Sequence, residues 1–170
     1  MNTNEQVNLR IATNKDLELV KYWDQQQHVI DSDPDDDWDW EYELNRFPDW
    51  RAQFIAEISG RAIGFIQIID PKKEDSQYWG DVPDNQRAID IWIGEQEDLG
   101  KGYGTQMMKL AIDYCFNNDN VNTILIDPLV SNTKAIRFYE KIGFHYVENR
   151  FFGKSECVVY KLDRKHWFSD

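Results

Sequence analysis

Three glycines stand at alternate positions in residues 99–105, which read Leu-Gly-Lys-Gly-Tyr-Gly-Thr. Glycine lets a backbone turn tightly and lie close to a ligand. Apolar residues at helical spacing follow, so the unpaired N–H groups and positive dipole end of that helix would face the loop. Together these groups make an anion site suited to a pyrophosphate. The segment fits neither the phosphate-loop pattern of nucleotide triphosphatases nor the dinucleotide fingerprint, and the alternative is a plain glycine-rich turn.

A second pattern begins about thirty residues further on. It reads Asn132-x-x-Ala135-x-x-x-Tyr139-x-x-x-Gly143-Phe144. In this order and spacing, the two motifs resemble the GNAT superfamily of acetyl-CoA-dependent N-acetyltransferases, and the resemblance covers residues 7–162. It implies that acetyl-CoA is the cosubstrate, that the glycine loop holds the CoA pyrophosphate, and that the helix carrying the second motif lies along the pantetheine.

The resemblance carries over residue by residue. Backbone N–H groups of residues 91–93 would polarise the thioester carbonyl, as in an oxyanion hole. Leu99 stands where the family usually has Gln or Arg, which removes one polar contact without touching the amide cradle. No metal is implied. The expected cosubstrate-binding residues are Ile91, Trp92, Ile93, Gly100, Lys101, Gly102, Tyr103, Gly104, Thr105, Asn132, Ala135 and Tyr139.

Within the superfamily, the chain is most similar to aminoglycoside 6'-N-acetyltransferases. The likeness rests on Leu99 before the glycine loop, the Asp127-Pro step, and the run Tyr-Glu-Lys-x-Gly-Phe that starts at Tyr139. It implies that Asp90 and Asp127 both contact the substrate. Asp90 is the expected general base, because flanking isoleucines would bury it and raise its pKa. Tyr139 would protonate the leaving thiolate. Each aspartate has a plainer alternative, a solvated or hydrogen-bonded strand end, and Tyr139 has that of a core tyrosine.

An acidic segment spans residues 31–43. It carries eight acids and no base, interleaved with aromatic residues. Aminoglycosides are polycations with sugar rings, so their pocket needs carboxylates and flat apolar faces. The expected substrate-binding residues are therefore Trp38, Asp75, Trp79, Asp90 and Asp127. Acid runs are more often solvated faces, and Trp38 and Trp40 cannot both face one side of a helix.

Composition limits the partners. The 170 residues contain 19 Lys and Arg against 31 Asp and Glu, a net charge of −12, which argues against nucleic acid as a partner. No apolar stretch reaches the ~20 residues of a membrane helix, and the start of the chain lacks a signal segment, so a cytoplasmic protein without a membrane partner is expected. Cys115 and Cys157 fall in apolar patterns and are expected to be buried thiols. The oligomeric state stays open between monomer and homodimer.

These side chains need a scaffold to bring them together. Alternating or apolar runs predict strands at residues 7–12, 53–58, 62–69, 87–94, 123–129, 144–152 and 156–162. Helices are expected after residue 13, over 102–116 and over 132–142. This order predicts a mixed α/β (α+β) fold in one domain, residues 1–170. The GNAT resemblance adds a mostly antiparallel sheet with a splayed central strand pair and flanking helices.

Two other functions remain open at this stage. One keeps the fold and changes the acceptor: an acyltransferase of siderophore or hydroxamate biosynthesis, or one acting on a polyamine or a protein N-terminus. The other is a CoA-binding module without catalysis, although a retained Tyr139 and a retained acid on the preceding strand argue against it. The first choice is direct acetyl transfer to the 6'-amine of an aminoglycoside within a ternary complex.

Overall fold

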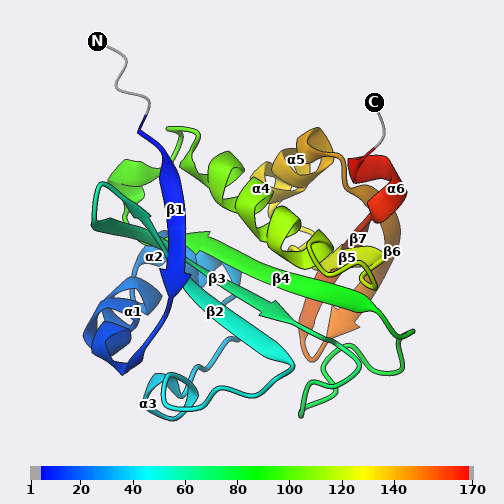
Figure 1. Cartoon of the computed structure of the whole chain (residues 1–170), viewed down its shortest axis with the longest axis horizontal. Coiled ribbons are helices and arrows are strands. Elements are labelled where there is room, and N and C mark those ends of the chain that lie inside the picture. Colours follow the sequence, from blue (N-terminus) through cyan, green and yellow to red (C-terminus); the bar gives the residue numbers. More distant parts are fainter. Residues whose placement is uncertain (1–4, 169–170) are drawn as a thin grey trace.

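The computed structural model describes residues 5–168. Seven strands form one sheet in the order β1-β2-β3-β4-β5-β7-β6, with β1 and β6 at its two ends (Figure 1). Neighbouring strands in this part of the chain are antiparallel, except β4 and β5, which are parallel. The strands are β1 (Val7–Ile11), β2 (Arg51–Ile58), β3 (Arg61–Ile69), β4 (Gln86–Ile93), β5 (Thr123–Ile126), β6 (His145–Phe152) and β7 (Ser155–Asp163).

Helices cover both faces of the sheet (Figure 1). Side chains alternate along β2, so Phe54 packs with α4 and α5 on one face, whereas Ile55 packs with α1 and α3 on the other. Strand β3 is buried on both faces, which explains its continuous apolar run. The helices are α1 (Leu17–Asp24), α2 (Gln27–Ser32), α3 (Trp40–Glu43), α4 (Tyr103–Phe116), α5 (Thr133–Ile142) and α6 (Arg164–Trp167).

The parallel pair at the centre of the sheet separates soon after it begins. Only residues 86–88 of β4 pair with residues 123–125 of β5. Strand β4 then continues to Ile93 alongside β3 alone. The fold expected from the sequence, including the splayed central pair, is confirmed. The edge of β4 that turns away from β3 is therefore open to a ligand.

The element boundaries differ from expectation in a few places. The strand expected over residues 123–129 ends at Ile126, because Pro128 lacks the N–H that a ladder needs. Helices α2 and α6 were not predicted individually, and both are short. Cys115 and Cys157 are buried and free, as predicted. No helix within residues 5–168 is long and apolar enough to cross a bilayer.

One glycine at the end of β4 is required by close packing. A Cβ added to Gly94 would lie 2.0 Å from the indole of Trp23, which is fully buried. We expect Gly94→Ala to lower the free energy of unfolding by about 2 kcal/mol, because a well-packed core cannot admit the methyl group without distortion. Urea unfolding measures this. The matched control is Gly104→Ala, whose Cβ would meet its nearest neighbours at 3.7 Å, so equal destabilisation by both variants would contradict the argument.

Candidate active site

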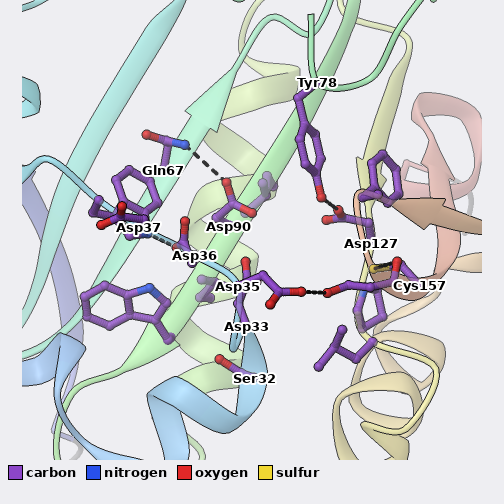
Figure 2. Close-up of a pocket in the computed structure, with 18 of the residues that line it drawn as sticks. Ser32, Asp33, Asp35, Asp36, Asp37, Gln67, Tyr78, Asp90, Asp127 and Cys157 are labelled. Atoms are coloured by element: carbon purple, nitrogen blue, oxygen red, sulfur yellow. Dashed lines mark hydrogen bonds between the residues drawn. The ribbon is translucent and has the colours of Figure 1, made fainter. Parts of the chain in front are cut away.

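A cavity of about 830 Å³ lies where β4 and β5 separate (Figure 2). Asp90 and Trp92 line it from the face of the sheet that carries α1 and α3. Ala135 and Tyr139 of α5 line it from the opposite face. The cavity therefore joins the two faces of the sheet through the gap between the strands. Two reactants can enter from opposite sides and meet there.

Asp90 lies on β4 and points into this cavity (Figure 2). Its carboxylate accepts a hydrogen bond from Nε2 of Gln67, at 3.2 Å. The side chain keeps surface accessible to water inside the cavity, while the walls of the cavity displace part of its hydration. This desolvation raises the pKa of Asp90 to about 6, with a smaller contribution from the charge of Asp33 and an opposing one from the Gln67 bond. A carboxyl group with such a pKa is ionised at neutral pH and more basic than usual.

Asp127 faces Asp90 from the other side of the gap (Figure 2). The hydroxyl of Tyr78 donates a hydrogen bond to its carboxylate, at 2.5 Å. The pKa of Asp127 is raised to about 8, mainly by burial and also by the nearby charge of Asp90. The Tyr78 bond, which favours the ionised form, only partly offsets these effects. The two carboxyl groups thus share a site in which negative charge is poorly compensated.

Tyr139 belongs to α5, whose position is fixed by a cap. The side chain of Asn132 accepts a hydrogen bond from the backbone N–H of Ala135, at 3.2 Å. About one helical turn after Ala135, the ring of Tyr139 lines the cavity. Burial, and then the charges of Asp90 and Asp127, raise the pKa of the Tyr139 hydroxyl above its usual range. This hydroxyl therefore stays protonated at neutral pH and can donate a proton.

The acidic segment forms one wall of the cavity. The sequence alone left open whether this segment faces a substrate or the solvent. Asp33, Asp35, Asp36 and Asp37 all line it. Burial raises the pKa of Asp36 to about 8, and the charges of Asp33, Asp90 and Asp24 add to the effect. The indole N–H of Trp38 donates to the Asp36 carboxylate.

The tryptophans of this wall adopt an arrangement that the sequence argument did not foresee. Trp38 lies before α3 and its ring stacks on that of Trp40, with centroids 4.5 Å apart and planes 7° apart. The objection that the two rings cannot share a helix face does not apply, because only Trp40 is helical. Trp38 lines the cavity.

Of the two expected substrate-binding residues in the loop between β3 and β4, one lines the cavity and the other does not. Trp79 reaches the cavity, but it is 4% exposed and belongs to a buried cluster that includes Ile69 and Val159. Asp75 does not line the cavity, and the expectation that it binds substrate is not supported. Its exposed carboxylate instead forms an ion pair with Arg46, at 2.9 Å. The neighbouring Tyr78, an aromatic residue of the same loop that was not among the expected substrate-binding residues, lines the cavity.

Gln67 was also missed by the sequence argument. It lines the cavity and contacts Asp90. The available signal was a single amide side chain within the apolar run of residues 62–69. A buried polar residue of this kind needs a partner, and here that partner is Asp90.

The glycine loop has the backbone that an anion cradle needs. Gly100 and Gly102 have φ angles of +73° and +83°, and a Cβ on either would meet nothing within 4 Å. Helix α4 starts directly afterwards, so the first N–H groups of residues 103–105 point at the loop. Lys101 is exposed beside them. The residues present therefore fit a pyrophosphate. Tyr103 contributes only backbone, because its hydroxyl donates to Glu5, at 2.8 Å.

The open edge of β4 offers a second set of backbone donors. The N–H of Gly94 donates to the carbonyl of Ile63 on β3, at 2.9 Å. Because N–H directions alternate along a strand, the amide of Trp92 also faces β3, whereas those of Ile91 and Ile93 face the gap. The Trp92 ring stacks on Phe65, with centroids 4.9 Å apart. Of the three strand residues expected to contact the cosubstrate, Ile91 and Ile93 present free amides and Trp92 does not.

Comparison with known proteins agrees with this geometry. The profile of the acetyltransferase (GNAT) domain matches residues 12–152. The chain belongs to the GNAT family. A curated relative, aminoglycoside N(6')-acetyltransferase type 1 of Klebsiella pneumoniae, is 30% identical over 152 residues, which cover 84% of this chain and 76% of the relative.

Solved structures of other GNAT proteins superpose closely. The aminoglycoside acetyltransferase AAC(6')-Ib in complex with coenzyme A has a TM-score of 0.84 at 26% identity, covering 95% of this chain and 97% of the other. Spermidine N-acetyltransferase from Vibrio cholerae, in complex with CoA and spermine, has a TM-score of 0.76 at 20% identity, covering 96% and 99%. This second likeness concerns the fold alone. Family membership makes the chain an acetyl-CoA-dependent acetyltransferase.

The crowded carboxyl groups of this GNAT site should cost the fold stability. Asp36 has a raised pKa in the folded chain, so folding binds its proton more tightly, and stability falls as pH rises from about 4 through about 8. We expect Asp36→Asn to raise the free energy of unfolding at pH 8.5 by about 1 kcal/mol, after allowing for screening of a partly exposed group. Urea unfolding at pH 6 and pH 8.5 measures it. A variant less stable than the parent at pH 8.5, or one matched by the exposed control Asp119→Asn, would contradict this.

Proposed function

We propose that the chain transfers the acetyl group of acetyl-CoA to a primary amine of a polycationic small molecule. The first candidate acceptor is the 6'-amine of an aminoglycoside. The observation that carries this proposal is a cavity with carboxylates on opposite walls, from Asp90, Asp127 and the acidic segment. The side chains of Trp38 and Tyr78 also line the cavity and form what is called its aromatic rim below. Several separated ammonium groups would relieve the repulsion that raises the pKa values of these acids.

The basic residues of the cavity wall do not cancel this charge. Arg51 is bound to Glu43, and Arg46 bridges Glu43 and Asp75. Lys154 lies at the tip of the β6–β7 turn. The remaining acids are thus available to ammonium groups of a substrate. Sugar rings would lie against the faces of Trp38 and Tyr78.

The proposed mechanism is direct transfer. Asp90 attracts the substrate ammonium and accepts its proton, directly or through water, which frees the nitrogen lone pair. The amine attacks the thioester carbonyl, whose oxygen accepts a hydrogen bond from the free amides of Ile91 or Ile93. As the C–S bond breaks, Tyr139 gives its proton to the thiolate sulfur, and the second proton lost by the nitrogen as it becomes an amide passes through water to restore the Tyr139 hydroxyl. Asp127 anchors a second ammonium group of the same substrate.

A second candidate keeps the chemistry and changes the acceptor. A linear polyamine or an N-hydroxylated diamine also carries separated ammonium groups. The curated N-hydroxyputrescine acetyltransferase of Acinetobacter baumannii is 22% identical over 132 residues, or 75% of this chain and 61% of that one. The feature that favours an aminoglycoside over these flexible acceptors is the aromatic rim. Flat aromatic rings pack well against sugar rings, whereas a flexible alkyl chain gains less contact energy from them.

The deciding experiment measures thiol release from acetyl-CoA with a panel of acceptors. The panel contains kanamycin, spermidine, N-hydroxylysine and a peptide with a free N-terminus. The expected result is the highest kcat/KM with kanamycin, and a product whose acetyl group lies on the 6'-nitrogen by NMR. Preference for another acceptor would reject the aminoglycoside proposal and keep the enzyme class. Salt should raise the KM for kanamycin, because the attraction is between charges.

A further inference from the structure

Three polar side chains form a row across the middle of the sheet. Gln53 of β2 lies directly opposite Gln67 of β3 in the strand register. Gln67 in turn lies opposite Asp90 of β4. Side chains at directly opposed positions share a face, so the row runs from the interior of the sheet to the cavity.

Two hydrogen bonds give the row a direction. Nε2 of Gln53 donates to Oε1 of Gln67, at 3.0 Å. Nε2 of Gln67 donates to Oδ2 of Asp90, at 3.2 Å (Figure 2). Because the Gln67 oxygen already accepts from Gln53, its NH₂ group must face the carboxylate. Turning this amide over would set the two oxygens, Oε1 of Gln67 and Oδ2 of Asp90, against each other.

Both glutamines are nearly inaccessible to water, at 8% and 9% exposed. Side chains alternate along a strand, so the neighbours of the two amides on their own face include Ile55, Phe65 and Ile69, and all three are buried. Burying an amide is unfavourable unless its polar atoms are bonded. Two adjacent amides in such surroundings are therefore held in one arrangement, and that arrangement ends at Asp90.

We propose that Gln67 is a positioning residue for Asp90 and that Gln53 fixes the direction in which the Gln67 amide points. The bond from Gln67 occupies one carboxylate oxygen and leaves the other facing the cavity, where an amine proton would arrive. It also favours the ionised carboxylate over the neutral acid. This inference rests on the proposed role of Asp90 as the general base.

The basic residues of the cavity wall, Arg46, Arg51 and Lys154, are not among the groups whose charge acts on Asp90. The titratable groups that face it are all acids or phenols: Asp33 and Asp36 of the acidic segment, Asp127 after β5, Tyr78 of the β3–β4 loop and Tyr139 of α5. The charged acids among them disfavour ionisation of Asp90. The Gln67 amide is the side-chain donor that opposes them, which explains why its loss should be visible in a titration.

The test titrates the Asp90 carboxyl carbon by NMR in the parent chain, in Gln67→Leu and in Gln53→Leu. Without the Gln67 donor, the pKa of Asp90 should rise by about one unit, the shift expected for loss of a hydrogen bond to a charged group. Gln53→Leu should give a smaller rise in the same direction, because the Gln67 amide is then free to turn. The exposed Gln25→Leu is the control and should give no shift.

Activity supplies the second readout. The acidic limb of the pH profile of kcat/KM should move upward with the Asp90 titration, while the rate at high pH and the Kd for acetyl-CoA change by less than about threefold. An unchanged Asp90 pKa in correctly folded Gln67→Leu would overturn the inference, and so would loss of activity at every pH without a shift. The NMR titration needs no substrate, so it reads the effect of Gln67 even if the proposed acceptor is wrong. A shifted titration with an unshifted rate profile would reject Asp90 as the base instead.

Discussion

Asp90→Asn should lower kcat/KM for the amine about 100-fold, the lower end of what a general base contributes. The amide is nearly the same size as the carboxylate, so the cavity and the splayed strands keep their shape. It cannot accept a proton from the ammonium at neutral pH. The affinity for acetyl-CoA should stay within a few-fold, because the backbone donors of the glycine loop and of β4 are untouched.

Steady-state kinetics and calorimetric binding of acetyl-CoA together measure this. The matched control is Asp119→Asn, an exposed aspartate after α4. A residual rate in Asp90→Asn that climbs with pH, as free amine becomes more abundant, would agree with the proposed role. If the variant keeps the parental rate at pH 7, Asp90 is not the base.

Tyr139→Phe should slow acetyl transfer by roughly 100-fold, as expected when a general acid is removed. The ring keeps its packing against Phe138 and Phe144, so the fold and the cavity persist. What disappears is the proton for the leaving sulfur. Because the pKa of Tyr139 is raised above its usual range, the parent should show no loss of rate from this group up to pH 10.

Single-turnover rates at saturating acetyl-CoA isolate this chemical step from binding. The control is Tyr114→Phe, whose ring is half exposed on α4. A thioester with a more acidic leaving thiol should recover most of the rate in Tyr139→Phe, since that sulfur needs no proton. Full activity of Tyr139→Phe with acetyl-CoA itself would remove the residue from the mechanism.

Local patterns were enough to place most of the scaffold. The apolar run on β3, the glycine turn before α4 and the helix that follows Asn132 are each decided by neighbours in the chain, so the sequence predicts them well. The splayed strand pair was available from the family resemblance. Its cause in this chain is partly local too, because the Asp127-Pro step ends β5 early.

Contacts between segments that are far apart in the chain could not be predicted from local sequence patterns. The bond between Tyr78 and Asp127 joins residues 49 positions apart, and periodicity does not indicate it. Asp75 and Tyr78 lie three positions apart in one loop, and only the fold decides that Tyr78 faces the cavity. The direction of each carboxylate in the acidic segment depends on where α2 and α3 pack. Tyr78, Asp127 and several acids of this segment all line the cavity.

The short ladder between β4 and β5 also divides the sheet mechanically. In the described sheet, strands β1–β4 and strands β5–β7 are hydrogen-bonded through three residue pairs, a short seam above the core cluster that both halves share. A cosubstrate held by β4 on one side and α5 on the other would fasten that seam. At 100 times its Kd it would add about 2.7 kcal/mol to the stability of the folded chain. Amide hydrogen exchange should therefore slow in both halves on binding, and β5, which pairs with β4 across the seam and with β7 on its other side, should report the coupling.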